Sequence, residues 1–462
     1  MGRVGRRGGA LAVALAVSLI AGCGVPPAVA PTGIHKIRHV VIIFQENRSF
    51  DSYFGTYPGA DGIPMKNGVP TVCVPDAVTG QCVRPFHDRY SLNYGGPHNW
   101  VNAVADVNGG KMNGFIAQAY KAASKRCAKN PLNPNCTQFS KGLPDVMGYH
   151  NGKDIPNYWA LAHHYVLQDH MFESIESWSF PSHLFLFSAW SANCSNPKNP
   201  MTCRGTHDPR NRTAHNPTPF GWTDLTYLLS KQGVSWACYL DGGSGGGFGG
   251  KGVPKIWNVL PGFVDVHQDQ QASNIQPLAK FFQAAKAGKL PAVTWILPSA
   301  KDSEHPPNLV STGQSYVTRL VDAVMKSPNW KSSAIFITWD DWGGFYDQVV
   351  PPKVDSLGYG LRVPGLVISP YAKRGYIDHQ TLSFDAYLKF IEDDFLHGQR
   401  LDPKTDGRPD PRPDVRENAP ILGNLTADFN FAQAPRRPFL LPVHPKTDLI
   451  LPHRSAGHHP RG

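Results

Sequence analysis

The sequence has no run of basic residues of the kind that lines a nucleic-acid groove, and charged residues make up only 17% of its 462 positions. A formal net charge of +10 spread so thinly argues against nucleic acid as a partner and favours anionic substrates or surfaces. The sequence also lacks internal repeats and any hydrophobic run long enough to cross a bilayer comfortably. Hydrophobic residues still account for 41% of the chain, so it is globular rather than disordered.

The first 22 residues contain no acid and are typical of an export signal. Three arginines precede an apolar run from Ala10 to Ala21, and this run is too short for a membrane-spanning helix. Ile20-Ala21-Gly22-Cys23 is similar to a bacterial lipobox, in which the cysteine becomes the lipid-modified first residue. The alternative is an ordinary cleavage site with an incidental cysteine. The sequence predicts an extracytoplasmic protein, either anchored to a membrane through Cys23 or secreted, and Arg6-Arg7 leaves twin-arginine export open.

No cysteine pair has the CxxC spacing of a zinc site, which argues against metal binding by the thiols. Six of the eight cysteines form three pairs, each nine positions apart in a loop rich in Pro, Asn and Gly. Loop-closing disulfides in an oxidising compartment are the natural interpretation. The predicted bonds are Cys73–Cys82, Cys127–Cys136 and Cys194–Cys203. Cys238 is then left as a buried strand thiol.

Five apolar runs rich in β-branched residues predict strands buried on both faces, because they are continuous rather than alternating. The runs cover residues 39–44, 234–240, 292–298, 333–340 and 363–370. Helical patterns lie among them at 222–231, 277–287, 314–326 and 385–396. This alternation predicts an α/β fold with a mostly parallel central sheet flanked by helices.

Residues 64–150 and 194–222 show little periodicity and carry the cysteine loops, so we expect them to be insertions over the sheet edge. From about Asp402 the chain is rich in Pro, Arg and Asp, which predicts a tail that is either disordered or packed as an extended arm. The predicted divisions are a signal peptide (1–22), a linker (23–35), a main domain (36–400) and a C-terminal tail (401–462).

Two of the predicted strands end in clustered oxygen ligands. Glu46-Asn47 follow the first strand, and Asp340-Asp341 stand at the end of the strand at 333–340. Ligands in such sheets bind at the carboxyl ends of the strands. Neighbouring buried carboxylates repel one another, so a divalent metal ion held by these four residues would supply the missing positive charge. The alternative is a pair of acids on an exposed loop.

A third polar element is Ser179, which precedes an apolar helical run that begins with Phe180-Pro181. A serine at this position is either a helix cap or, beside a metal, a nucleophile. The end of the helix would also stabilise a phosphate group. Glu304-His305, past the strand at 292–298, and His98 are further candidates for binding a phosphoryl group or protonating a leaving oxygen.

Several of these motifs, in this order, resemble one known family. They are "ENRSFDSYFG", "NGGKMNGF", "SEHPP", "GQSYV", "WDDWGGFYDQVVPP" and "RVPGLVISPYAKRGYIDH". Together they are similar to the bacterial phosphoesterase family of non-haemolytic-type phospholipases C and acid phosphatases, over roughly residues 36–396. The resemblance implies an alkaline-phosphatase-like fold. It also implies that Glu46, Asn47, Asp340 and Asp341 hold a metal, that Ser179 is the nucleophile, and that His98 and His305 line the phosphate site.

The chain departs from the family pattern at two places. Ser177-Trp178 stands where Gly-Pro usually precedes the nucleophile, and Ser182 stands where Asn precedes His183, so Ser177 and Ser182 are alternative nucleophiles. Gln348 replaces a histidine of the family's usual motif, which bears on substrate specificity.

These features predict an exported, metal-assisted hydrolase of phosphate esters that acts on phospholipids through Ser179. A monoester phosphatase of the same family is the nearest alternative. A surface lipoprotein without catalytic activity is the alternative from another class.

Overall fold

The computed structural model describes residues 1–2, 5, 31–127, 139–140, 143–203, 205, 219–246 and 252–452. Cys23, Cys136 and most of the predicted signal peptide lie outside these described residues, and the predicted disulfide Cys127–Cys136 therefore does too. The predicted disulfides Cys73–Cys82 and Cys194–Cys203 are confirmed, and Cys238 is a buried free thiol as predicted.

An eight-stranded sheet forms the centre of the molecule, with strand order β15-β12-β16-β1-β17-β18-β10-β19. Its strands are β1 (His39–Gln45), β10 (Val166–Gln168), β12 (Trp236–Leu240), β15 (Ile275–Pro277), β16 (Val293–Leu297), β17 (Ser333–Trp339), β18 (Gly365–Ile368) and β19 (Tyr376–Asp378). All neighbouring strands are parallel except the two pairs that involve β18. The five predicted strands are therefore confirmed, but β18 runs in the reverse direction. An apolar run buried on both faces carries no signal for strand direction.

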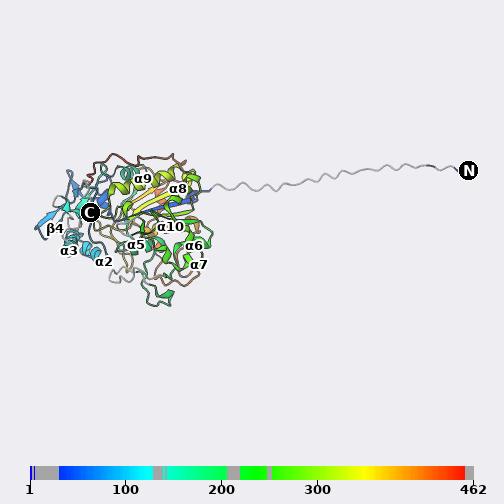
Figure 1. The fold of residues 1–462 in the computed structure, drawn as a ribbon, viewed down its shortest axis with the longest axis horizontal. Coiled ribbons are helices and arrows are strands. Elements are labelled where there is room, and N and C mark those ends of the chain that lie inside the picture. Colours follow the sequence, from blue (N-terminus) through cyan, green and yellow to red (C-terminus); the bar gives the residue numbers. More distant parts are fainter. Residues whose placement is uncertain are drawn as a thin grey trace, which may run out of the picture.

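Helices cover both faces of this sheet. Helices α8 (Leu278–Ala287) and α9 (Val310–Lys326) lie on one face, and α5 (Ser179–Ser188) and α10 (Phe384–Phe395) lie on the other (Figure 1). The remaining helices are α1 (Phe50–Phe54), α2 (Trp100–Val107), α3 (Phe115–Cys127), α4 (Pro156–His164), α6 (Leu225–Lys231) and α7 (Val264–Gln268). The mostly parallel α/β architecture predicted from the alternating pattern is confirmed.

The predicted insertion at residues 64–150 contains more structure than its weak periodicity indicated. It holds α2, α3 and several two-stranded pairs. The short strands outside the main sheet are β2 (Met65–Lys66), β3 (Val69–Pro70), β4 (Val74–Asp76), β5 (Gln81–Val83), β6 (Phe86–His87), β7 (Phe139–Ser140), β8 (Leu143–Pro144), β9 (Gly148–Tyr149), β11 (Met171–Phe172), β13 (Ser244–Gly246), β14 (Val253–Pro254) and β20 (Leu382–Ser383). Helices α2 and α3 and strand β4 gather at one end of the molecule, away from α6 and α7 (Figure 1).

Residues 401–452 form an extended arm that packs against the rest of the protein. Arg412 donates hydrogen bonds to the carbonyls of Ser188 and Thr223, and Arg416 donates to the carbonyl of Ser174. The first and last of these carbonyls lie at the C-terminal end of α5 and ahead of its start, so the arm holds this helix from two sides. Of the two forms predicted for the tail, the described part adopts the packed arm.

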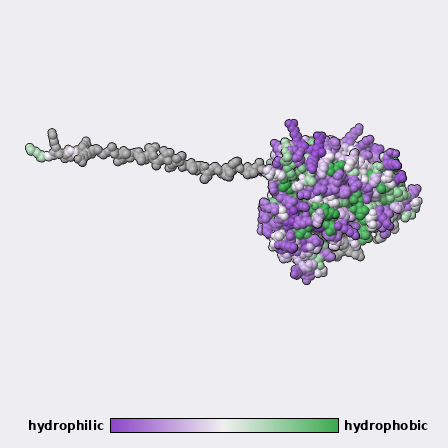
Figure 2. Space-filling view, turned by 180° about the vertical axis from the view of Figure 1, so that it is seen from behind, coloured by the Kyte–Doolittle hydropathy of each residue, from purple (hydrophilic) through white to green (hydrophobic). Residues whose placement is uncertain are grey.

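The surface is mostly hydrophilic with small hydrophobic patches on the face seen in Figure 2. In the described part of the chain, no helix has the length and apolar character needed to cross a membrane.

One buried cation, Arg362, ties several loops together below the carboxyl edge of the sheet. Its guanidinium donates to Asp347 (2.9 Å) and Asp51 (3.2 Å), and also to the carbonyls of Asp61 and Asp169. These four hydrogen bonds use four of the five N–H groups of the guanidinium and reach separate segments of the chain. The side chain has no exposed surface. This interaction joins α1 to the loop that follows β17.

We expect Arg362→Met to lower the free energy of unfolding by about 3–5 kcal/mol, because Asp51 and Asp347 would stay buried without their counter-ion. Denaturant unfolding measures this change. Lys326→Met is the matched control, since Lys326 is 59% exposed and pairs with Asp322 on the surface of α9, where the loss should be below about 1 kcal/mol. Equal losses in the two variants would show that Arg362 does not hold the loops.

Candidate active site

The site lies where β1 and β17 end side by side. Gln45 is paired with Trp339 in a parallel register, and the amide of Asp340 donates to the carbonyl of Gln45 at 2.9 Å. The next residues of both strands therefore emerge next to each other. The structure brings Glu46 and Asn47 together with Asp340 and Asp341, as the strand-end pattern predicted.

Asn47 fixes the two aspartates in place. Its backbone amide donates to Asp340 Oδ1 (2.8 Å), and its side-chain Nδ2 donates to Asp341 Oδ1 (2.6 Å). Asn47 has φ 59°, a left-handed conformation that asparagine tolerates better than most residues. Gly343 closes the loop, because its amide donates to Asp341 Oδ1 and a Cβ there would lie 2.8 Å from that of Asn47.

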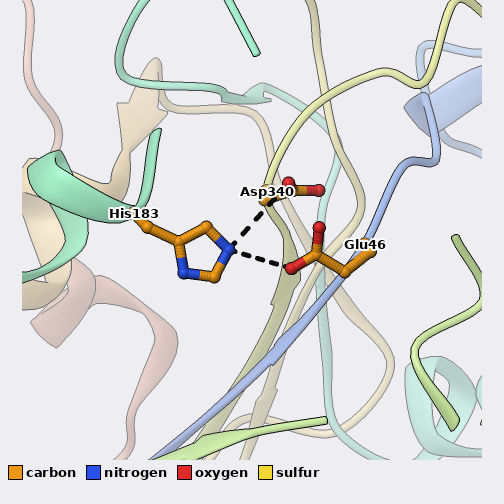
Figure 3. Close-up of side chains that lie close together, drawn as sticks. All are labelled: Glu46, His183 and Asp340. Atoms are coloured by element: carbon orange, nitrogen blue, oxygen red, sulfur yellow. Dashed lines mark hydrogen bonds and ion pairs between the residues drawn. The ribbon is translucent and has the colours of Figure 1, made fainter. Parts of the chain in front are cut away.

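Helix α5 supplies two more side chains from its first turns. His183 Nε2 lies 2.9 Å from Glu46 Oε1 and 4.0 Å from Asp340 Oδ2 (Figure 3). Ser179 Oγ lies 3.2 Å from Asp341 Oδ2 and 3.3 Å from Glu46 Oε2. Residues four apart lie on the same face of a helix, so both side chains reach the carboxylates.

The two alternative serines occupy different positions. Ser182 Oγ donates to the backbone carbonyl of Asp340 at 2.7 Å, and the amide of Ser177 donates to the carbonyl of Ile175. The Ser179 hydroxyl lies within hydrogen-bond reach of both the Glu46 and the Asp341 carboxylates. The Ser177-Trp178 departure therefore leaves Ser179 at the start of α5, with Trp178 in the N-cap position.

Burial raises the pKa values of the three carboxylates at the site. Glu46, Asp340 and Asp341 have no exposed surface. Burial and the neighbouring carboxylates raise the pKa of Glu46 well above its usual value, and burial together with Asp341 raises the pKa of Asp340 to about 7. Burial also raises the pKa of Asp341 to about 7 and lowers the pKa of His183 to about 3. Burial thus disfavours negative charge on the three acids and positive charge on the imidazole.

These residues fit a divalent metal ion. Glu46, His183 and Asp340 each offer a ligand atom, and these atoms lie within 4.8 Å of one another. Asp340 Oδ2 and Asn47 Oδ1 are buried and accept no hydrogen bond, although buried oxygens are normally satisfied. Carboxylate and amide oxygens with one imidazole nitrogen suit a hard or borderline cation. His183 is a candidate ligand that the sequence analysis missed, and its i, i+4 spacing from Ser179 was the available signal.

His98 and His305 form a second group beside the carboxylates. Their rings lie 5.9 Å apart, and Trp257 lies between His305 (5.9 Å) and His183 (6.4 Å). The Nδ1 atoms of His98 and His305 lie 2.8 and 2.7 Å from the carbonyls of Gly96 and Pro306. A carbonyl only accepts, so Nδ1 carries the proton and Nε2 of the neutral ring carries the lone pair. Burial lowers the pKa of His305 to about 3, which keeps that ring neutral.

Glu304 occupies a different position from the one expected of a substrate-binding side chain. Its carboxylate is buried and accepts hydrogen bonds from Tyr53, Tyr158 and Trp339 at 2.7–3.0 Å. Glu304 has φ 69°, and both of its oxygens are occupied by these aromatic partners. The carboxylate therefore braces the core behind the site, and burial raises its pKa to about 6.

Gln348, the second departure, lies on the loop that follows the two glycines. Its Nε2 donates to Asp61 Oδ1 (3.1 Å) and to the carbonyl of Gly62. The side chain is thus tied to a neighbouring loop.

A family model described as the Phosphoesterase family matches residues 37–396. The chain belongs to that family. Membership indicates a hydrolase that acts on phosphate ester bonds. The match covers the strand-end carboxylates, the start of α5 and both histidines of the second group.

The chain is also similar to individual proteins. It is 28% identical to "Non-hemolytic phospholipase C" of Burkholderia pseudomallei, across 88% of this chain and 61% of that protein. It is 26% identical to "Phospholipase C B" of Mycobacterium tuberculosis, across 88% of this chain and 80% of that protein. A solved protein "in the Alkaline Phosphatase Superfamily from Vibrio parahaemolyticus" is 13% identical, with a TM-score of 0.30 over 51% of this chain and 60% of that one. A TM-score this low carries no argument about the fold.

We expect added Mn²⁺, Ca²⁺ or Zn²⁺ to raise the melting temperature, and to do so more at pH 8 than at pH 5.5. The pKa values of Asp340 and Asp341 lie at about 7, so both are mainly protonated below that pH and must lose protons to bind a cation. At a metal concentration about a hundredfold above Kd, the gain in stability is about 2.7 kcal/mol.

Differential scanning fluorimetry measures this response. Asp340→Asn should abolish it. Asp394→Asn is the control, because Asp394 is also a buried acid with a raised pKa but pairs with His35, ahead of β1. A shift that survives Asp340→Asn would place the metal elsewhere.

Proposed function

We propose that this protein is an exported, metal-assisted phosphoesterase that cleaves phospholipids in the manner of a phospholipase C, with Ser179 as the nucleophile. The observation that carries the proposal is the position of Ser179 Oγ at the start of α5, 3.2–3.3 Å from the Asp341 and Glu46 carboxylates. The names of the relatives from Burkholderia and Mycobacterium support the phospholipid as substrate. The chain spans 61% of the Burkholderia protein, so the substrate is inferred from similarity to part of that relative.

Glu46, Asn47, Asp340 and Asp341 would hold the metal, with His183 as an additional ligand. A divalent cation held there would supply positive charge that lowers the pKa of the Ser179 hydroxyl and stabilises the negative charge of the phosphate. Ser179 is the first residue of α5, so the positive end of the helix dipole favours the negative charge of the substrate phosphate.

In the first step, Ser179 Oγ loses its proton to solvent and attacks phosphorus, and the bond from phosphorus to the lipid oxygen breaks. The negative charge of the bound phosphate favours a protonated imidazole, so Nε2 of His98 or His305 takes up a proton from solvent. That proton passes to the leaving oxygen and releases diacylglycerol. In the second step, a water oxygen bonds to phosphorus and the bond between phosphorus and Ser179 Oγ breaks. One water proton returns to Oγ, and the phosphorylated headgroup leaves.

Export is part of this proposal. The disulfides Cys73–Cys82 and Cys194–Cys203 support an oxidising compartment. Lipid anchoring at Cys23 stays a prediction from the sequence, and so do the domain boundaries.

We expect Ser179→Ala to lower turnover of p-nitrophenylphosphorylcholine by roughly a thousandfold or more, because the nucleophile is lost. Ser182→Ala is the matched control on the same helix turn. It loses one hydrogen bond to a backbone carbonyl, so its rate should fall by less than about tenfold. If Ser179→Ala kept wild-type turnover, Ser179 would not be the nucleophile.

We expect the wild-type protein to hydrolyse the diester p-nitrophenylphosphorylcholine with a kcat/KM roughly tenfold or more above that for the monoester p-nitrophenyl phosphate. With phosphatidylcholine, the products should be diacylglycerol and phosphocholine. The reverse preference would identify a monoester phosphatase. Turnover of neither ester in the presence of metal would favour a protein without catalytic activity.

A further inference from the structure

Helix α2 (Trp100–Val107) turns apolar side chains towards solvent. Val101 and Val104 are 52% and 45% exposed. Val350, 47% exposed, lies at the C-terminal end of this helix, where its methyl groups are 3.8–3.9 Å from the position of a Cβ on Gly110. We call these three residues the valine face.

The pattern of α2 differs from that of an ordinary surface helix, because two of its three valines face outwards while Val107 packs against the core. A surface helix normally buries its apolar side and exposes its polar side. In α2 the buried residues are Ala103 and Asp106, and the Asp106 carboxylate accepts a hydrogen bond from the Trp342 indole at 3.0 Å. The polar group anchors the helix from inside, and the two exposed valines face outwards. Exposed apolar groups that lie together are candidate binding surfaces.

The valine face adjoins the candidate active site. Helix α2 is capped by Asn99, and this cap residue directly follows His98. The segment before it is held against the loop that follows Asp341, since the Gly96 amide donates to the Gly343 carbonyl at 2.8 Å. The ring of His98 lies 6.3 Å from that of Trp342, the indole that anchors α2. A surface that docks on α2 and Val350 therefore lies beside the histidines of the site.

The chain around α2 is strongly basic. Asp106, which is buried, is the only acid in residues 89–144. The basic residues of this segment are Arg89, Lys111, Lys121, Lys125, Arg126, Lys129 and Lys141. Lys111 is exposed and lies four residues after the end of α2 at Val107. Lys121 is exposed on α3, which packs against α2. Exposed valines on α2, with exposed lysines on the segments next to it, match a layer of anionic headgroups above hydrocarbon.

We propose that the valine face docks on the surface of a phospholipid bilayer, with Lys111 and Lys121 towards the headgroups. The inference rests on the proposed phospholipid substrate and adds the surface by which the enzyme meets it. Val101, Val104 and Val350 enter the boundary between headgroups and acyl chains, and the neighbouring site receives one lipid headgroup. The small side chains give weak, reversible binding, which lets the enzyme move from lipid to lipid.

The test compares binding and turnover in the full-length protein and its Val101→Asp/Val104→Asp variant. Binding is measured by co-sedimentation with vesicles of phosphatidylcholine and phosphatidylglycerol. Turnover is measured on the same vesicles and on soluble p-nitrophenylphosphorylcholine. We expect the variant to bind vesicles roughly tenfold or more weakly, and its ratio of vesicle to soluble turnover to fall by a similar factor.

Leu440→Asp is the matched control, because Leu440 is 46% exposed on the C-terminal arm, whose next residue, Leu441, donates to Asp322 of α9. It should leave vesicle binding and the ratio unchanged. Lys111→Glu/Lys121→Glu should weaken binding to the anionic vesicles, and raised salt should reduce the difference from wild type. If circular dichroism shows that the aspartate variant does not fold, the Val101→Ser/Val104→Ser variant replaces it in the same measurements.

Wild-type affinity for vesicles in the Val101→Asp/Val104→Asp variant would overturn the inference, and so would a wild-type protein that binds no vesicles. In the second case, a protein partner would be the occupant of the valine face. Failure of the proposed function gives a different result. The wild-type protein would then bind vesicles through the valine face but hydrolyse neither the lipid nor the soluble ester.

Discussion

Mutual repulsion among three buried carboxylates is the constraint on which the site depends. Glu46, Asp340 and Asp341 are held together without exposure to water, and burial raises the pKa of each. Such an arrangement is stable when protons or a cation offset the charge. The left-handed Asn47 and the start of α5 direct hydrogen-bond donors or ligand atoms at this charge. The chemistry proposed for Ser179 follows from its place in the same cluster.

The surrounding core holds the strand-end loops in place. Arg48 donates to the Asn47 carbonyl (2.6 Å) and to the Tyr53 hydroxyl, which in turn donates to Glu304. Arg362 likewise links α1 to the loop that follows Gly343-Gly344, by donating to Asp51 and Asp347. Both guanidinium groups are fully buried, so each holds its loop by hydrogen bonds inside the core. Positioning of this kind is what an active site requires of its supporting residues.

The insertion at residues 64–150 and the central sheet have different roles. The sheet and α5 position the reacting groups, whereas α2 and its neighbours form the surface beside them. Loops and insertions vary without disturbing the core, so approach to the substrate can change while the carboxylate cluster stays fixed. The arm at 401–452 adds a further support, since Arg412 and Arg416 hold the segment that carries Ser179.

The sequence by itself determined the five core strands, the flanking helices, two disulfides and the meeting of Glu46-Asn47 with Asp340-Asp341. Continuous apolar runs report burial on both faces, and parallel strands bring their carboxyl ends to one edge. Only the tertiary structure decided the reversed direction of β18, the contact of His183 with Glu46 and the inward position of Glu304. Each of these depends on which segments become neighbours in space, and a local pattern of hydrophobic and polar residues does not encode that. The outward valines of α2 belong to the same class, because exposure is a property of the packed molecule.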